Sequence, residues 1–187
     1  MHRLTTLGAV LAGGRSSRFG SDKAEALLRG QPLLAHAIAA LRPHGDAVVV
    51  VGRQTGLAAS VGDWPAPGLG PLGGLAGALR HAREHGFAQV LTAPVDCVTL
   101  PGALRTLLEP APAFAVAHPV IGLWPVTALP ALEDLLRHSE NRAVRGFAQI
   151  IGARPVADVG SLVNINRAED LQRLDAAGRS TSSPSPR

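Results

Sequence analysis

An apolar run that stops abruptly at two adjacent glycines constrains this chain more than any other feature. The run covers Leu4–Leu11, and the glycine pair at positions 13 and 14 follows almost at once. Adjacent glycines expose backbone N–H groups that no Cβ shields. The cations Arg15, Arg18 and Lys23 come next. Because backbone donors beside positive charge form a site for polyphosphates, the stretch predicts a buried strand that ends in a phosphate-binding loop.

This loop is not one of the two most common phosphate-binding motifs. The G-x-x-x-x-G-K-[ST] spacing requires a Gly-Lys pair, and the chain contains none. The G-x-G-x-x-G spacing of dinucleotide-binding proteins is absent from this stretch. A glycine- and serine-rich surface turn with solvated charges is the plain structural alternative.

A longer pattern, LAGGxSxRxGxDK, fits the stretch at nine positions in thirteen residues. It resembles the signature of nucleotidyltransferases with a Rossmann-like fold, and most closely that of the molybdenum cofactor guanylyltransferases (the MobA family). The resemblance implies that Arg18 and Lys23 are catalytic and offset charge on a triphosphate. The nucleotide-binding residues that it implies here are Leu11, Ala12, Gly13, Gly14 and Lys23. The matching positions are Leu11, Ala12, Gly13, Gly14, Ser16, Arg18, Gly20, Asp22 and Lys23.

The length and the cysteine content bound the organisation of the chain. Its 187 residues suit one domain, which we expect over residues 1–177. The polar tail at 178–187 has nothing to bury and is expected to be disordered. No apolar run approaches the roughly 20 residues of a membrane span, so we expect no membrane partner. The single cysteine, Cys97, excludes an intramolecular disulfide and a cysteine-based zinc cluster, which favours a cytoplasmic protein.

The formal net charge of +4 raises the question of a nucleic-acid partner. The basic residues are scattered, however, and form no run. Aromatic side chains, which would stack on bases, make up only 3% of the chain. A small anionic substrate explains the excess charge as well, and we expect no nucleic-acid partner.

Strand patterns alternate with helical patterns along the chain. Ala47–Val51 is a β-branched run, typical of a strand buried on both faces, and Pro32 opens a helix at the position that proline favours. The alternation predicts an α/β protein: a single-domain, three-layer α/β/α Rossmann-like fold with a mostly parallel central sheet. A weak helix is expected over 54–60. Further strands are expected over 4–11, 89–93, 113–117, 120–124, 156–158 and 162–165, and further helices over 101–108 and 128–138.

Four glycines and three prolines make residues 63–74 a rigid, irregular loop. The loop resembles the family's D-x(n)-GPLxGL element, which frames the nucleoside. Leu72, Leu75 and Leu79 also form an apolar stripe at helical spacing, so the same stretch is compatible with the start of a core helix. The nucleotide-binding residues that the match implies are Asp63, Gly70, Pro71 and Leu72, and Gly73 completes the motif.

Asp96 follows the strand expected over 89–93, at the carboxyl edge of the sheet. Ligands bind at this edge in open α/β folds. The resemblance makes Asp96 a catalytic and nucleotide-binding residue and the ligand of a Mg²⁺ cofactor. The alternative is a loop aspartate that caps Val98 or Thr99.

Two stretches in the second half of the chain resemble segments that the family uses toward a pterin substrate. His118 stands in an HP pair and is a candidate pterin contact, with a hydrogen-bonded structural histidine as the equal alternative. Arg142 and Arg145 match a GERRVRxF segment. Their i, i+3 spacing would put both on one helix face, which points either to the pterin phosphate or to solvent.

The closing NINRAEDL stretch resembles the family's N-[IV]-N-x-x-E-[DE]-L motif. Asn166, with Glu169 three residues later, predicts a capping box for a last helix. Helix capping alone is enough to explain an asparagine at position 166. Asn164 has no such reason and is the better candidate to contact metal or phosphate. Both asparagines are candidate contacts of the pterin substrate.

The activity that the resemblance implies is the transfer of GMP from GTP to molybdopterin or Mo-molybdopterin. Pyrophosphate leaves, and the guanine dinucleotide form of the cofactor results. GTP and molybdopterin are thus the expected partners, with transient contact to molybdenum-insertion proteins or molybdoenzyme chaperones.

Related activities remain open at this point. One is a nucleotidyltransferase that uses CTP on molybdopterin or a nucleoside triphosphate on a sugar phosphate. Relatives that use CTP tend to have LAAG where this chain has LAGG, which favours GTP. The asparagine that helps some family members to bind guanine after the second strand is missing from AVVVVG. An inactive adaptor with a retained cleft is a further alternative.

Overall fold

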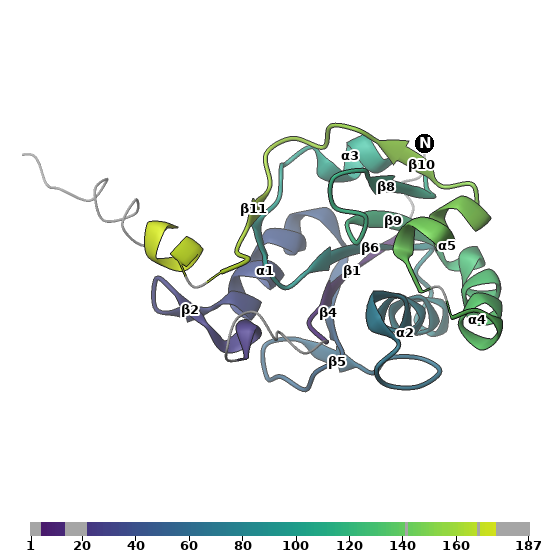
Figure 1. Ribbon diagram of the computed structural model, residues 1–187, viewed down its shortest axis with the longest axis horizontal. Helices are drawn as coiled ribbons and strands as arrows, with labels where there is room; N and C mark the ends of the chain where they lie inside the picture. The colour runs from purple at the N-terminus through teal and green to yellow at the C-terminus, as the bar shows by residue number, and fades with distance from the viewer. Residues whose placement is uncertain (1–4, 14–21, 141, 168, 175–187) are drawn as a thin grey trace, which may run out of the picture.

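A mostly parallel sheet runs through the centre of the molecule (Figure 1). The computed structural model describes residues 5–13, 22–140, 142–167 and 169–174. Within these ranges, seven strands form the sheet in the order β10-β8-β9-β6-β1-β4-β5. Neighbouring strands are parallel except at β9, which is antiparallel to β6 and β8. The strands are β1 (Thr6–Leu11), β4 (Ala47–Val51), β5 (Ala59–Val61), β6 (Gln89–Pro94), β8 (Ala113–Ala115), β9 (Gly122–Pro125) and β10 (Arg154–Val156).

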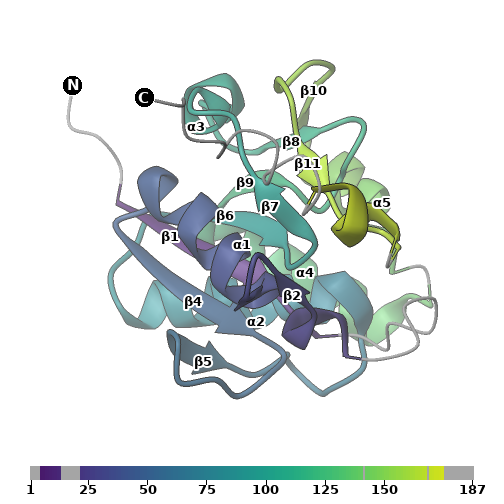
Figure 2. The same ribbon diagram turned by 90° about the vertical axis from the view of Figure 1, so that its left-hand side faces the viewer.

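Helices cover both faces of this sheet (Figures 1 and 2). On one face pack α1 (Leu33–Leu41) and α3 (Leu104–Leu108). On the other face pack α2 (Gly70–Glu84), α4 (Leu129–His138) and α5 (Val144–Ile150). The three-layer α/β/α fold predicted from the alternating pattern is confirmed.

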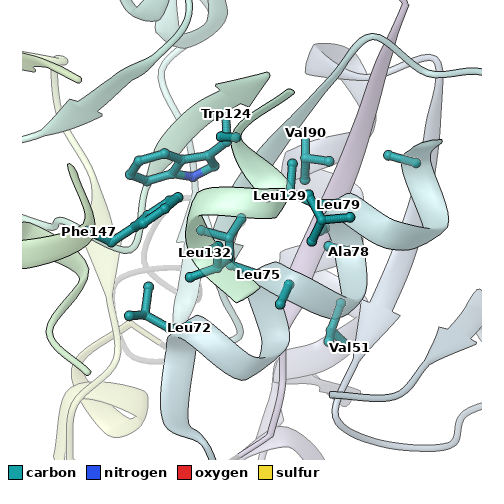
Figure 3. Packing of buried hydrophobic residues seen from close by; sticks show 14 of the residues in the cluster. Val51, Leu72, Leu75, Ala78, Leu79, Val90, Trp124, Leu129, Leu132 and Phe147 are labelled. Carbon is teal, nitrogen blue, oxygen red and sulfur yellow. The ribbon is translucent and has the colours of Figure 1, made fainter. Parts of the chain in front are cut away.

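Alternate residues of the central strands contribute to two separate cores. In β1, Ala9 packs on the α2 side and Val10 on the α1 side, as the two-residue period of a strand requires. Trp124 and Phe147 are the largest fully buried side chains of the α2-side core, with ring centroids 5.8 Å apart (Figure 3). The buried Trp124 indole N–H donates to Thr92 Oγ1 at 2.9 Å. Phe114 is a third buried aromatic side chain of this core, and Leu, Val and Ala side chains make up the rest of its buried residues.

Short elements bring the C-terminal part of the chain back to the sheet. Strand β7 (Cys97–Thr99) pairs antiparallel with β11 (Val163–Asn164). The Ile165 backbone N–H donates to the Asp96 carbonyl at 2.9 Å. The closing NIN stretch therefore lies against the residues that follow β6. The remaining short elements are the hairpin β2 (Leu27–Leu28) and β3 (Gln31–Pro32) and the 3-10 turns η1 (Lys23–Glu25), η2 (Arg42–His44) and η3 (Val126–Ala128).

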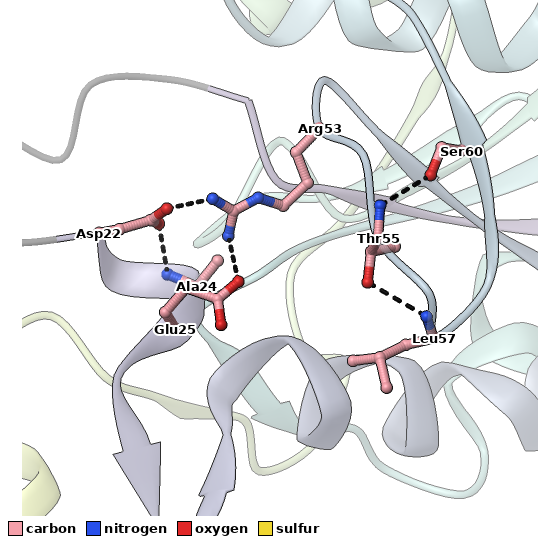
Figure 4. Close-up of polar contacts among 7 residues, drawn as sticks. All are labelled: Asp22, Ala24, Glu25, Arg53, Thr55, Leu57 and Ser60. Atoms are coloured by element: carbon pink, nitrogen blue, oxygen red, sulfur yellow. Dashed lines mark hydrogen bonds and ion pairs between the residues drawn. The ribbon is translucent and has the colours of Figure 1, made fainter.

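Residues 54–60 form no helix, so that prediction is wrong. The Thr55 backbone N–H donates to Ser60 Oγ at 3.1 Å, and Thr55 Oγ1 accepts from the Leu57 N–H at 3.2 Å (Figure 4). Side-chain bonds of this kind compete with the backbone bonds of a helix. The segment instead leads into β5, which extends the sheet beside β4.

The predicted capping box at the last helix is also wrong in its acidic partner. Asp170 Oδ2, and not Glu169, accepts the backbone N–H groups of Asn166 and Arg167, each at 2.9 Å. These bonds hold the pKa of Asp170 below its ordinary value.

The strand expected over 156–158 lies earlier in the sequence, at β10. Among the described residues, no helix has the length and apolar character needed to cross a bilayer.

Helix α2 passes so close to residue 62 that a side chain at Gly77 has no room. A Cβ there would lie 2.1 Å from the Gly62 carbonyl oxygen. We predict that Gly77→Ala lowers the free energy of unfolding by roughly 1–3 kcal/mol, the usual cost of overpacking, although alanine is the better helix former. Urea titration measures the change. Gly102→Ala is the control, because nothing lies within 4 Å of a Cβ at that position; equal stability of the two variants would contradict the close approach.

His44 lies buried in η2. Burial first, and the charge of Arg105 second, lower the pKa of His44. The unfolded chain takes up a proton at an ordinary pKa of about 6.5, whereas folded His44 stays neutral to lower pH. The free energy of unfolding therefore falls as the pH drops below about 6.5. We predict that His44→Gln loses less stability than the wild type between about pH 7.5 and about pH 5.5, measured by urea unfolding. An equal loss in both proteins would remove His44 as a source of the pH dependence.

Candidate functional site

The order of strands reverses between β1 and β6. From β1 the chain continues to β4 on one side, and it later reaches β6 on the other. Ligands of open α/β sheets bind at such a switch point, beyond the carboxyl ends of the strands. Here the Ala12 backbone N–H donates to Val51 at 2.9 Å, and the Val95 N–H donates to Leu11 at 3.1 Å. The segments that follow β1, β4 and β6 therefore meet at one edge, as the sequence predicts.

Lys23 and Asp96 form an ion pair across this edge. Lys23 Nζ lies 2.8 Å from Asp96 Oδ2, and the two side chains are 12% and 23% exposed. Lys23 begins η1, whose N-cap Asp22 accepts the Ala24 backbone N–H at 3.1 Å. The structure thus brings together a predicted catalytic cation and the predicted metal ligand. Gly14 and Arg18, also assigned to this site from the sequence, lie outside the described residues.

A cavity of about 670 Å³ opens where β1 and β4 end. This volume is within the range of about 300–1,000 Å³ that is typical of small-molecule sites. Among the described residues that were predicted to bind nucleotide, four do not line it: Ala12, Lys23, Leu72 and Asp96. The Leu72 side chain is fully buried in the α2-side core, as the alternative interpretation of that leucine predicts. The lining residues are Leu11, Gly13, Val51, Gly52, Asp63, Pro67, Gly68, Gly70, Pro71 and Gly74.

Two glycines bring the ends of β1 and β4 into backbone contact at this cavity. Gly52 has a φ of +83°, and a Cβ on it would lie 2.6 Å from the Gly13 Cα. The same Cβ would lie 3.4 Å from Asp63 Oδ1. The Asp63 carboxylate therefore stands beside both glycines, and no other residue type fits at Gly52 without displacing backbone.

Trp64 anchors the loop that carries Asp63. Its indole N–H donates to Glu133 Oε1 on α4 at 2.8 Å. The guanidinium of Arg80 on α2 lies 4.0 Å from its ring centroid, a cation–π contact. Sequence analysis did not predict this role of Trp64, because only the fold places α2 and α4 beside the loop. The one available signal was a tryptophan within a loop rich in glycine and proline.

Arg53 is the second residue that sequence reasoning missed. It follows Gly52 at the end of β4 and forms ion pairs with Asp22 and with Glu25, the latter at 3.2 Å between Nη1 and Oε1 (Figure 4). The hydrogen bond from Arg53 is the main reason that the pKa of Asp22 lies below its ordinary value. Arg53 therefore joins the end of β4 to the turn that contains Lys23.

His118 and Asn164 lie together on the other side of Asp96. Asn164 Nδ2 lies 3.1 Å from His118 Nδ1, within hydrogen-bond distance. Within the described residues, Asn164 Oδ1 is buried without a hydrogen-bond partner. Buried carbonyl oxygens are normally paired, so this one is available to a ligand. Two of the predicted pterin contacts thus form one polar cluster.

The two predicted arginines do not share a helix face. Helix α5 begins at Val144, so Arg142 precedes the helix and only Arg145 lies on it. Arg145 Nη2 donates to the Val116 carbonyl at 2.5 Å and so reaches the segment before His118. Arg142 is exposed. The i, i+3 interpretation is therefore wrong, because the helix starts two residues later than the pattern suggested.

Cys97 cannot serve as a nucleophile in this site. Its side chain is fully buried, and burial, followed by the nearby charge of Asp96, raises its pKa to about 12. The thiolate, which is the reactive form, is therefore essentially unpopulated at neutral pH. The chemistry available here comes from the Lys23–Asp96 pair, backbone amides and a bound ligand's own groups.

Most of the chain matches one known protein family. The family model described as a MobA-like NTP transferase domain matches residues 8–151. A Sinorhizobium fredii protein named molybdenum cofactor guanylyltransferase is 41% identical to this chain, over 89% of the chain and 88% of the relative.

Solved structures share the fold at lower identity. The molybdopterin-guanine dinucleotide biosynthesis protein A of Archaeoglobus fulgidus superposes with a TM-score of 0.71 over 93% of this chain and 99% of its own, at 20% identity. A Mycobacterium tuberculosis protein solved in complex with manganese has a TM-score of 0.58 over 92% of this chain and 99% of its own, at 17% identity. At these identities, the likeness supports the fold alone.

Proposed function

The chain belongs to the MobA-like NTP transferase family, and we propose that it transfers GMP from GTP to molybdopterin. An oxygen of the pterin's terminal phosphate attacks the α-phosphorus of GTP. The bond from that phosphorus to the bridging β-phosphate oxygen breaks, and pyrophosphate leaves with the electron pair. The product is the guanine dinucleotide form of the molybdenum cofactor. The name carried by the relative at 41% identity supports this choice of substrates.

One observation carries the proposal: a lysine–carboxylate pair stands at the switch point of the sheet, at the same edge as a cavity of nucleotide size. Nucleotidyl transfer needs positioning and neutralisation of charge more than covalent catalysis. Lys23 supplies a positive charge on a partly buried side chain, where it is screened less than it would be in water. The Gly13 amide and Lys23 hold the phosphates, together with Gly14 and Arg18 as predicted from the sequence.

The nucleoside occupies the cavity between the paired glycines and the loop at residues 67–71. Gly13 and Gly52 present bare backbone to the base, and Asp63 is the acceptor for an N–H or O–H group of the nucleoside. Trp64 holds Asp63 in place through α2 and α4. These contacts replace the strand-end asparagine that this chain lacks.

The residues of this edge fit a divalent cation that enters with the nucleotide. Within the described ranges, no three or more histidine, cysteine or acidic side chains are grouped so that they could hold a metal ion. Mg²⁺ usually binds through one or two carboxylates plus substrate phosphates, and Asp96 provides such a carboxylate. The Mycobacterium tuberculosis protein that shares this fold was solved in complex with manganese. When bound, Mg²⁺ neutralises charge on the phosphates, and Asp96 is the residue that holds it.

The pterin binds on the β7–β11 side of Asp96. The Asn164 carbonyl oxygen, which has no hydrogen-bond partner among the described residues, accepts an N–H of the pterin ring, and His118 offers a ring nitrogen. Arg145 orders the segment before His118 and keeps further donors for the pterin phosphate; Arg142 and Asn166 complete the predicted contacts. In this proposal the reaction takes place in the cytoplasm, and proteins that insert molybdenum or receive the product are transient partners.

Removal of the Asp96 carboxylate should abolish most activity without unfolding the protein. We predict that Asp96→Asn releases pyrophosphate on the order of 10²-fold more slowly or worse, with an unchanged melting temperature. Asp134→Asn, on the exposed part of α4, is the matched control and keeps full activity. Near-normal turnover of Asp96→Asn at saturating Mg²⁺ would remove this residue from the site.

Nucleotide choice tests the guanylyl assignment itself. We predict that the wild type releases pyrophosphate from GTP in preference to ATP and CTP, and only when molybdopterin is present. A Cβ at Gly13 would lie 3.2 Å from the Gly52 Cα and 3.8 Å from Asp63 Oδ1, so Gly13→Ala narrows the cavity. Because a purine is larger than a pyrimidine, this variant should shift toward CTP in competition assays. Equal use of CTP and GTP by the wild type would overturn guanylyl transfer and leave nucleotidyl transfer intact.

A further inference from the structure

Arg53 bridges two carboxylates that flank Lys23 in the sequence. Its guanidinium pairs with Asp22, immediately before Lys23, and with Glu25, two residues after it. Figure 4 shows the planar group reaching both acids from the end of β4. Only 20% of the Arg53 side chain is exposed, against 51% for Asp22 and 62% for Glu25. The arginine is therefore the inner member of this cluster.

The two ion pairs span the whole of the turn η1. That turn is three residues long, too short to be stable by its own hydrogen bonds. Asp22 closes it at the start, where Oδ1 accepts the Ala24 N–H. Arg53 then fixes both ends of the turn to β4. The backbone of Lys23 is thus held by an element on one side of β1, while its ammonium reaches Asp96 on the other side.

Arg53 itself has no place in the nucleotide cavity. Its neighbour Gly52 lines that cavity, but Arg53 does not. Two carboxylates already offset its single charge. A lysine has a flexible four-carbon side chain, and ordering it costs conformational entropy. Because the backbone of Lys23 is fixed, less conformational entropy is lost when its side chain binds a phosphate.

We propose that Arg53 is a positioning residue that holds the Asp22–Glu25 turn so that Lys23 points across β1 to Asp96 and the bound phosphates. The inference rests on the proposed function for its catalytic consequence, but its structural part does not. Arginine is required because its planar fork reaches two carboxylates at once, whereas a lysine reaches them only as a point charge.

The sequence offers a direct readout of Lys23, which is the only lysine in the chain. Amine-selective acetylation followed by peptide mass spectrometry therefore reports on this one side chain, separately from the N-terminal amine. We expect Arg53→Gln to raise the rate of Lys23 acetylation several-fold, because the contact with Asp96 loosens. Glu25→Gln removes only one of the two ion pairs of Arg53, so it raises the rate of Lys23 acetylation less. It serves as a second variant if Arg53→Gln folds poorly. Arg137→Gln removes the ion pair between the exposed Arg137 and Glu133 on α4, far from η1 in the sequence, and leaves the rate unchanged.

A kinetic double-mutant cycle separates positioning from direct contact. Arg53→Gln should lower kcat/KM for GTP by roughly 10-fold to 100-fold, the range expected for a misplaced catalytic group, and Arg53→Lys should restore part of it. In a Lys23→Met background the same Arg53→Gln change should leave kcat/KM almost unaltered, because the lysine that Arg53 positions is absent.

Two results would overturn the proposal. One is an unchanged acetylation rate of Lys23 in Arg53→Gln. The other is an undiminished decrease in kcat/KM for GTP when Arg53→Gln is made in the Lys23→Met background, which would mean that Arg53 contacts substrate directly. If acetylation responds as expected but the wild type does not turn over GTP, the positioning role stands and the proposed function fails.

Discussion

The close approach of two backbones at the ends of β1 and β4 is the constraint on which the site depends. Gly13 and Gly52 meet with no side chain between them, and a Cβ on Gly52 would lie 2.6 Å from the Gly13 Cα. This contact leaves space for the cavity and sets the Asp63 carboxylate beside it. It also places Arg53, the next residue, within reach of the turn that carries Lys23.

Charge at this edge is arranged in a chain that crosses three strands. Arg53 after β4 holds the turn of Lys23, and Lys23 pairs with Asp96 after β6. Beyond Asp96, the β7–β11 pair presents Asn164, whose carbonyl oxygen has no hydrogen-bond partner in the described part of the chain. Under the proposed function, the nucleotide and the pterin therefore bind on separate sides of the lysine–carboxylate pair. In-line transfer needs such an arrangement, because the attacking and leaving groups lie on opposite sides of the phosphorus.

Local patterns were sufficient where one residue type decides the structure. The β-branched run Ala47–Val51 forms β4 with the predicted bounds, and Asp96 stands at the carboxyl edge of β6 as its place after an apolar run indicates. Long-range contacts were not predictable in this way. The side-chain hydrogen bonds of Arg53 and Trp64 join them to residues 28 to 69 positions away in the sequence. The helix expected over 54–60 gave way to the Thr55 bonds, and α5 began too late to include Arg142.

The most direct test of the account is a crystal structure of the protein with Mg²⁺ and a GTP analogue whose α–β bridging oxygen is replaced by a methylene group. We expect the guanine in the cavity between the paired glycines, Gly13 and Gly52, and the loop at residues 67–71, with the phosphates at Lys23 and the metal on Asp96. A nucleotide bound elsewhere, with the Lys23–Asp96 pair intact at 2.8 Å, would contradict it.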